Sequence, residues 1–209
     1  MDIMEIVRLI ITSITSIIAA LITAGFFKTW WEKKSEFRSR KKLVGQIESD
    51  TLVYQTLKQL KHDYNCDRIY IIQFHNGDSF YTESPMQKAS ATYEICNTGL
   101  ERVSDRFQGV LVSHYSWYIS QSMKNEMFYY NVEHVEDATT KSLLNYRGAQ
   151  SHCGIPLYDD KKHLVGLFCA DWVFSEVPDH SIEGFEFTEE YKKEFYTQGN
   201  SMVKLMKSN

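Results

Sequence analysis

The N-terminal quarter of the chain contains one long apolar run followed directly by a basic one. Leu9 to Phe27 is a stretch of nineteen residues without a charged side chain, enough for a helix to cross a hydrocarbon core of about 30 Å. Trp30 and Trp31 follow it at the depth expected for lipid headgroups. We therefore predict a short N-terminal segment over 1–8 and a transmembrane helix over 9–27.

The charges on either side of this run predict the orientation of the protein in the membrane. Asp2 and Glu5 precede the run, so the basic N-terminal region of a cleaved signal peptide is missing. The positive-inside rule then places the C-terminal part in the cytoplasm of a single-pass cell (inner) membrane protein. A solvated helix face and contact with anionic lipid headgroups both remain open for these basic residues. Seven basic residues follow the run: Lys28, Lys33, Lys34, Arg38, Arg40, Lys41 and Lys42.

From Lys33 to about Tyr64, apolar residues recur every three to five positions, which predicts an amphipathic helix. We expect a break or cap near Ser49 and Asp50, dividing a basic juxtamembrane helix (28–50) from a folded domain (51–209). The first half is expected to pair with a partner helix, which indicates a homo-oligomer formed through the membrane and connecting helices. The second half is expected to pack on a sheet through Leu52, Leu57 and Leu60.

The folded domain alternates short strand patterns with helix patterns. Strands are predicted over 67–75, 89–97 and 128–135, with a polar loop over 79–88 between the first two. Helices are predicted over 113–123, 137–146 and 188–207, with Ser113 and Asp137 as candidate N-caps. This order indicates an α+β domain with a largely antiparallel sheet, helices on one side and an exposed groove on the other.

The clearest local prediction is a hairpin of two strands, 151–158 and 163–172, joined by the charged turn 159–162. Gly148 before the first strand suggests the C-terminal cap of a helix. Pro156 implies a sheet edge or a bulge, because proline donates no ladder hydrogen bond, and Gly166 suggests a second geometric requirement. The order of helix, glycine, strand ending in Pro-Leu, charged turn and strand beginning Val-Gly resembles the C-terminal half of a GAF domain.

The GAF resemblance covers about 51–207 and implies a ligand sensor or a dimerisation module without catalysis of its own. The Asn-Lys-Phe-Asp-Glu run of cyclic-nucleotide-binding members is absent, and no cysteine is assignable to bilin attachment, so no cofactor is expected. In overall plan the chain also resembles T-even-type phage holins, which implies an alternative function in lysis timing. The soluble domain of those holins faces the periplasm, opposite to the orientation predicted here.

Composition limits the function classes further. The formal net charge of −4 argues against general nucleic-acid binding, so we expect the lipid bilayer and a small-molecule ligand or a protein partner instead. No phosphate-binding loop, metalloprotease or hydrolase signature is present, and an enzyme is not expected. The four cysteines form no C-x-x-C pair, and we read them as unpaired, mostly buried thiols.

A few polar and aromatic residues are candidates for a ligand site. His75 and Asn76 end a strand, where they either contact a polar ligand or simply form a turn. Asp171, if it points inward, needs a partner such as Arg147 or His152. Three histidines and two cysteines could meet in a soft metal site, but they lack ligand spacing and no metal is expected. The aromatic candidates line either a pocket for a planar ligand or the core: Tyr93, Trp117, Tyr118, Tyr146 and Trp172.

Overall fold

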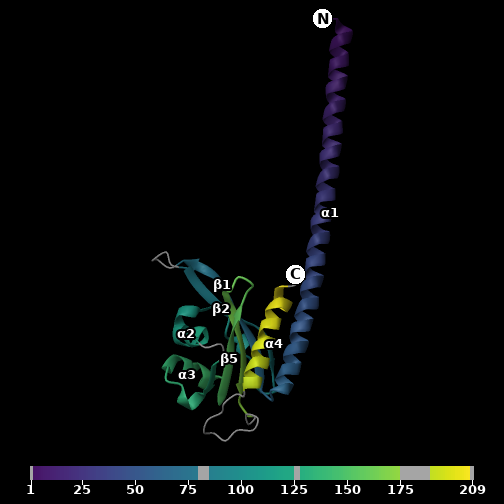
Figure 1. Ribbon diagram of the computed structural model, residues 1–209. Helices are drawn as coiled ribbons and strands as arrows, with labels where there is room; N and C mark the ends of the chain where they lie inside the picture. The colour runs from purple at the N-terminus through teal and green to yellow at the C-terminus, as the bar shows by residue number, and fades with distance from the viewer. Residues whose placement is uncertain (1, 80–84, 125–127, 175–188, 208–209) are drawn as a thin grey trace. The chain divides into compact units, whose positions relative to one another are not determined.

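The computed structural model describes residues 2–79, 85–124, 128–174 and 189–207 (Figure 1). It leaves undescribed the side chains of 6–11, 13–29, 32, 38–39, 76–79, 85–86, 128, 130, 189–192 and 207. The described chain divides into two compact units, one within 1–47 and one within 48–208. Each unit is described by itself below.

Helix α1 (Ile3–Asp63) provides all the described secondary structure of the first unit and also begins the second. The backbone of the predicted transmembrane segment 9–27 is helical, but its side chains, Thr12 excepted, lie outside the described residues. Among the residues that the structure does describe, no helix is long and apolar enough to span a membrane. The predicted break near Ser49 and Asp50 is wrong, because both residues are helical.

The second unit is built on a six-stranded sheet with the strand order β3-β2-β1-β6-β5-β4. All neighbouring strands are antiparallel, as the sequence predicted. The strands are β1 (Arg68–Ser79), β2 (Pro85–Cys96), β3 (Val110–Leu111), β4 (Phe128–Asn131), β5 (Ser151–Tyr158) and β6 (Leu164–Trp172). The first two extend into the predicted loop over 79–88, covering 79 and 85–88. Strand β4 ends four residues earlier than predicted because the 3₁₀ turn η3 (Val132–His134) follows it.

Helices cover both faces of this sheet, so the prediction of helices on one side only is wrong. The end of α1 and α4 (Glu189–Lys207) pack on one face, and α2 (Ser116–Lys124) and α3 (Ala138–Tyr146) lie over the other (Figure 1). Alternation along the strands separates the two cores, since neighbouring side chains point to opposite faces. Ile71 and Phe168 enter the α1/α4 core, whereas Ile72 and Leu167 enter the α2/α3 core.

The helix that enters the sheet domain buries a slightly different set of residues from the predicted one. Leu57 and Leu60 pack in the α1/α4 core as expected, but Leu52 is exposed and Val53 is buried in its place. The spacing of 53, 57 and 60 is the three- and four-residue repeat of one helix face. Leu52 lies one position off that stripe, which explains its exposure.

The predicted hairpin is confirmed. Strand β5 has the predicted bounds and β6 begins one residue later than expected. Gly148 ends α3 as predicted: it follows the C-cap residue Arg147 and has a left-handed φ of 70°. The described part of β4 pairs with 151–154 of β5 and does not extend to Pro156. Gly166 instead lies in the sheet interior, where an added Cβ would be 2.1 Å from the carbonyl oxygen of Ile72.

The two predicted helix caps differ in outcome. Asp137 caps α3, since its carboxylate accepts the backbone N–H of Thr140 at 2.7 Å. Ser113 does not cap α2, because the 3₁₀ turn η2 (Val112–Tyr115) precedes that helix and Leu111 begins the turn. A further 3₁₀ turn, η1 (Val103–Asp105), lies between β2 and β3.

Candidate functional site

A row of charged and polar side chains crosses three adjacent strands beneath α2. Arg68 of β1 and His152 of β5 are both cross-strand partners of Asp171 on β6. All three residues have zero exposure. Nη1 of Arg68 donates to Oδ2 of Asp171 at 2.7 Å, and Nδ1 of His152 lies 2.6 Å from Oδ1. The strand register therefore places a carboxylate between a guanidinium and an imidazole inside the protein.

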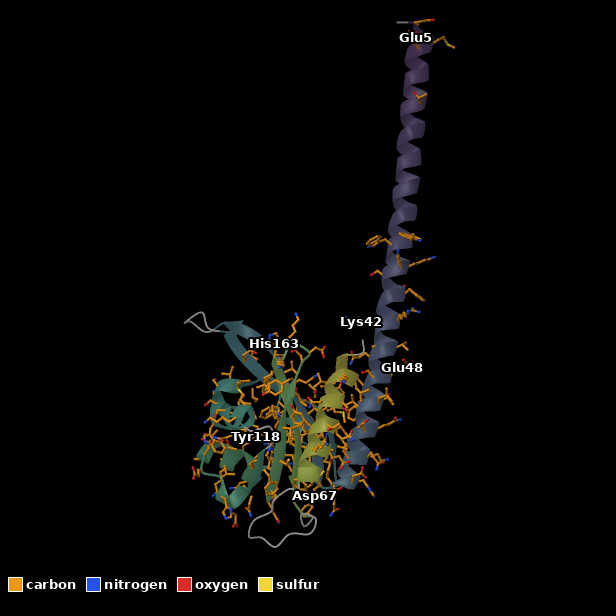
Figure 2. All side chains as sticks on the ribbon, in the orientation of Figure 1. Glu5, Lys42, Glu48, Asp67, Tyr118 and His163 are labelled. Carbon is orange, nitrogen blue, oxygen red and sulfur yellow. The ribbon has the colours of Figure 1, made fainter. Side chains whose placement is uncertain are left out.

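This row continues to α2 through Tyr118. A carboxylate only accepts hydrogen bonds, so Nδ1 of His152 carries the proton, and in the neutral ring Nε2 is an acceptor. The Tyr118 hydroxyl oxygen lies 2.6 Å from Nε2 of His152, within hydrogen-bond distance, and 3.5 Å from the thiol of Cys169. Figure 2 shows Tyr118 inside the domain, with Asp67 and His163 near opposite ends of the sheet.

The surroundings of the row determine the ionisation of Asp171 and Tyr118. Burial alone would raise the pKa of Asp171, but the hydrogen bond with His152 and the charges of Arg68 and Arg147 lower it to about 2. Burial raises the pKa of Tyr118. Asp171 is therefore ionised and Tyr118 protonated at neutral pH, and the row holds a stable charge rather than a reactive one.

A second buried carboxylate, Glu94 of β2, balances the other side of Arg68. Its Oε1 lies 3.5 Å from Nε of Arg68, and its two oxygens accept the backbone N–H groups of Val103 and Ser104 at 2.8 Å. Arg102, half exposed, approaches Glu94 at 3.9 Å. Arg68 thus connects two carboxylates, and a buried ion pair of this kind depends on both partners being present.

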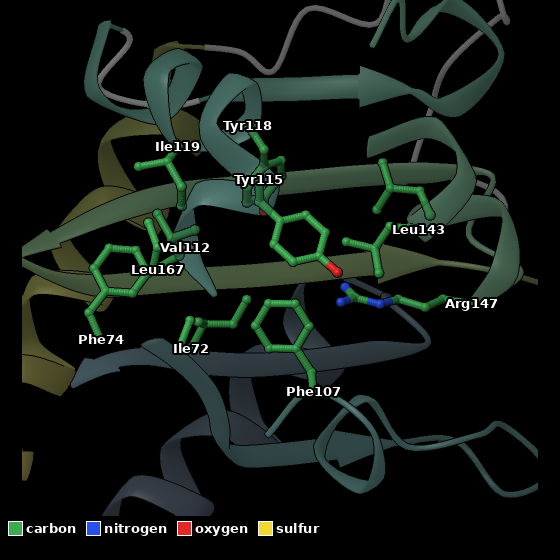
Figure 3. A pocket seen from close by; sticks show the side chains of 12 residues that line it. Ile72, Phe74, Phe107, Val112, Tyr115, Tyr118, Ile119, Leu143, Arg147 and Leu167 are labelled. Atoms are coloured by element: carbon green, nitrogen blue, oxygen red, sulfur yellow. The ribbon is translucent and has the colours of Figure 1, made fainter. Parts of the chain in front are cut away.

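A narrow cavity lies beside this network, on the sheet face covered by α2 and α3 (Figure 3). Its free volume is about 20 Å³, which is room for about one water molecule. The polar lining residues are Tyr115, Tyr118 and Arg147, and the others are apolar: Ile72, Phe74, Ala89, Phe107, Val112, Ile119, Leu143, Leu144 and Leu167.

Arg147, the C-cap residue of α3, provides the charge of this cavity. Its guanidinium lies 5.3 Å from the centre of the Phe107 ring and 5.6 Å from that of Tyr70, distances that favour cation–π attraction. Nη1 donates to the Tyr70 hydroxyl at 2.9 Å, which itself donates to Asp171 at 3.3 Å. In Figure 3 Arg147 extends toward the rings of Phe107 and Tyr115.

An open groove of about 310 Å³ lies on the opposite sheet face near the end of α4. Two of its polar side chains are already bonded within the protein. Nε2 of His75 lies 2.9 Å from the Ser90 hydroxyl, and Nε2 of Gln73 donates to the sulfur of Met206 at 3.1 Å. We therefore take the smaller, charged cavity under α2 and α3 as the candidate site.

The structure brings together only two of the eight residues proposed for the site from the sequence. His152 and Asp171 are bonded to each other, and Trp117 packs nearby against the α2/α3 core. The side chain of Asn76 lies outside the described residues. The others lie elsewhere: His75 and Tyr146 are exposed, and Tyr93 and Trp172 belong to the α1/α4 core.

The two aromatic candidates on the α1/α4 face have structural partners there. The Tyr93 hydroxyl donates to Asp50 at 2.5 Å, and the indole N–H of Trp172 donates to the carbonyl of Tyr64 at 3.3 Å. Among the described residues no three His, Cys, Asp or Glu side chains are placed to hold a metal ion. His152 and Cys153 are neighbours on one strand and point to opposite faces.

Sequence reasoning left out Arg68 and assigned Arg147 only as a partner for Asp171. One signal for Arg68 was present, since an arginine at the start of an otherwise apolar strand (68–72) needs a buried partner. No signal indicated that Arg147 lines a cavity, because it follows a helix at a turn. Of the four thiols, Cys66, Cys153 and Cys169 are buried and Cys96 is partly exposed.

No family model and no curated protein sequence matches the chain. Solved structures do match, and they define the class of fold. The blue-light-absorbing form of the PixJ GAF domain from Thermosynechococcus elongatus aligns with a TM-score of 0.56 at 12% identity, covering 78% of this chain and 88% of that one. The red/green cyanobacteriochrome NpR6012g4, in its red-light-absorbing state, gives 0.57 at 13% identity, with coverages of 77% and 96%.

The GAF domain region of a putative membrane protein from Geobacter sulfurreducens PCA also aligns, with a TM-score of 0.51 at 11% identity and coverages of 80% and 98%. At these identities the comparison establishes the fold alone. The sheet with its flanking helices therefore has the GAF fold, as the pattern of the hairpin indicated.

Proposed function

We propose that this protein is a non-enzymatic sensor or regulatory protein of GAF type, which binds a small ligand in the cavity under α2 and α3. One observation carries the proposal: an apolar cavity with a guanidinium at its wall lies beside a buried charge network. A few convergent polar groups in an apolar pocket are typical of small-molecule sites. Two of the proteins with a similar fold are a cyanobacteriochrome receptor and a far-red cyanobacteriochrome photoreceptor.

The burial of the side chains that could act as nucleophile or base favours a non-enzymatic function. The Tyr118–His152–Asp171 row resembles a nucleophile, base and orienting acid in its connections, but all three side chains are buried. Burial raises the pKa of both the Tyr118 hydroxyl and the Cys169 thiol, the latter to about 12. Both groups therefore stay protonated, which suits a structural role better than attack on a substrate.

Strands β1 and β6 provide a route for a binding signal to α1. Ile72 and Leu167 line the cavity, while their neighbours Ile71 and Phe168 pack in the core that contains Leu57 of α1. A ligand that moves one face of these strands thus changes packing on the other. It shifts the equilibrium between two packings only as far as it binds one of them better.

A membrane anchor over 9–27 and a cytoplasmic sensor domain complete the proposal. They are supported by the nineteen uncharged residues and by the basic flank over 28–42. The similar GAF domain region from Geobacter sulfurreducens PCA belongs to a protein named as a putative membrane protein. The alternative of a phage holin gains no support from these structural neighbours.

Thermal unfolding of the full chain in lipid nanodiscs, with a library of metabolites, tests ligand binding. We expect at least one compound to raise the unfolding temperature of the wild type and to lose this effect in Ala89→Val. Ala89 is buried at the cavity wall, and the two added methyl groups occupy a space that holds about one water. Thr98→Val, an exposed position on the turn after β2, serves as the control.

If no compound stabilises the wild type, or if Ala89→Val responds as the wild type does, the proposed site is wrong. The orientation is tested separately with reporter enzymes fused to the C-terminus. Activity of a cytoplasmic reporter supports the predicted topology, and activity of a periplasmic reporter contradicts it.

A further inference from the structure

The guanidinium of Arg147 has one nitrogen whose hydrogen bonds are not used by the protein. Nη1 bonds to Tyr70, but Nη2 is buried and meets no hydrogen-bond acceptor among the described residues. A buried donor without an acceptor is costly, the more so when it is charged. Since Arg147 lines the cavity, a bound group that brings an acceptor to this point would remove that cost.

The charges around the cavity identify the kind of acceptor. In the described part of the chain, Glu94 and Asp171 are the carboxylates of the network, and both lie within 4 Å of Arg68. Arg102 also approaches Glu94. Both buried carboxylates thus pair with Arg68, whereas Arg147 has no direct ion pair in the described part of the chain. A buried cation without a direct ion pair favours an anionic ligand over a neutral one.

The apolar side chains that line the cavity limit the chemistry of the ligand beyond its charged group. Nine lining side chains are aliphatic or phenylalanine, so the part of the ligand beyond its charged group is apolar. The free volume of about 20 Å³ holds about one water molecule, so an organic ligand enters only if the walls move apart, and a short ligand requires the smallest movement. A small inorganic anion fits the volume but would place its other faces, stripped of water, against hydrocarbon.

We propose that the cavity, widened by a movement of its walls, binds a short aliphatic monocarboxylate, of the size range from acetate to butyrate, through Arg147. This inference rests on the proposed sensor function and specifies its ligand class. The carboxylate accepts from Nη2 of Arg147, and the alkyl chain packs between α2 and the sheet. The Tyr115 hydroxyl, which bonds to no other described residue, is the second donor to the carboxylate.

Titration calorimetry on the full chain in nanodiscs tests the ligand class. Sodium acetate, propionate and butyrate are compared at pH 7 with their neutral amides, and sodium chloride and sodium nitrate are run at equal ionic strength. We expect the best carboxylate to bind about 10- to 100-fold more tightly than its amide, as a charged hydrogen bond in a buried site implies. Equal affinities would overturn the assignment, and tighter binding of chloride or nitrate would assign an inorganic anion site instead.

Variants identify the residues that recognise the carboxylate. Arg147→Met is expected to remove the preference for acid over amide, and Tyr115→Phe to weaken carboxylate binding about 2- to 10-fold. Arg106→Met is the matched control: this arginine is 65% exposed and pairs with Glu101, so its loss should leave affinity unchanged. Tyr115→Phe leaves the buried charged residues unchanged. It therefore tests carboxylate binding in the cavity even if Arg147→Met unfolds the protein.

The experiments distinguish a wrong ligand class from a wrong sensor function. If other metabolites stabilise the wild type through a site that Ala89→Val blocks, while carboxylates and Arg147 have no effect, the sensor function stands and the ligand class is wrong. If no compound of any class binds, both are wrong.

Discussion

Replacing Asp171 by asparagine tests how much the buried row contributes to folding. The change keeps the shape of the side chain but removes the charge between Arg68 and His152, all three having zero exposure. Nη1 of Arg68 then faces a neutral amide, with Glu94 at 3.5 Å as its remaining ion-pair partner. Removing one partner of a buried pair costs about 3–5 kcal/mol, so we expect Asp171→Asn to lose about that much unfolding free energy.

The pKa of Asp171 determines how the loss of unfolding free energy in Asp171→Asn depends on pH. Its pKa is about 2 in the folded protein, against about 3.9 for an unfolded aspartate. A lowered pKa stabilises the fold above pH 3.9 and ceases to do so as pH falls toward 2. The shift corresponds to about 2–3 kcal/mol at neutral pH, of which roughly half is lost by pH 3. The wild type should therefore approach the Asp171→Asn variant in stability as the solution is acidified.

Urea unfolding at pH 7, 5, 4 and 3, followed by tryptophan fluorescence, measures both effects. Asp63→Asn, at a carboxylate that is 44% exposed near the end of α1, is the control and should change stability by no more than about 0.5 kcal/mol. A loss below about 1 kcal/mol for Asp171→Asn, or a difference from wild type that stays constant down to pH 3, would refute the reasoning.

Three further predictions concern packing and thiol chemistry. Gly166→Ala should destabilise the domain by about 3 kcal/mol, because the new Cβ would lie 2.1 Å from the carbonyl oxygen of Ile72; an unchanged urea midpoint would contradict this. Trp172→Ala, at a side chain 1% exposed, should cost about 3–5 kcal/mol, whereas Trp31→Ala, 57% exposed, should cost less than about 0.5 kcal/mol in the same urea titration. A disulfide reagent should modify one thiol of the native chain, that of Cys96, and all four after unfolding; rapid modification of two or more in the native state would disagree with the burial described.

The local sequence signals predicted the hairpin and several helices well. The charged turn over 159–162, the left-handed Gly148 and the cap at Asp137 each act over a few residues, so their structure depends little on the rest of the chain. The bounds of β5 and the antiparallel character of the sheet followed from the same patterns. The GAF fold was inferred mainly from this region, and the solved structures support it.

The candidate site was predicted less well, because distant segments form it. Arg68 and Asp171 are 103 positions apart and Tyr118 and His152 are 34 apart, and no local pattern gives the strand order β1-β6-β5 that joins them. Tyr93 and Trp172 were proposed for the pocket because they are aromatic. Which sheet face each residue occupies depends on strand phase, and for Tyr93 also on the register shift between Ile71 and Ile72 in the β1–β2 pair, which composition does not reveal.

The position of Asp171 also bears on how faithfully the chain folds. A slip of β6 by one residue against β1 and β5 would turn every side chain of β6 to the other face. The carboxylate of Asp171 would then enter the apolar core that contains Trp172 and Phe195, and Arg68 and His152 would lose their common partner. The charged row thus penalises a misaligned central sheet, and a misfolded chain of this kind would carry an unpaired buried charge that chaperones and proteases could act on.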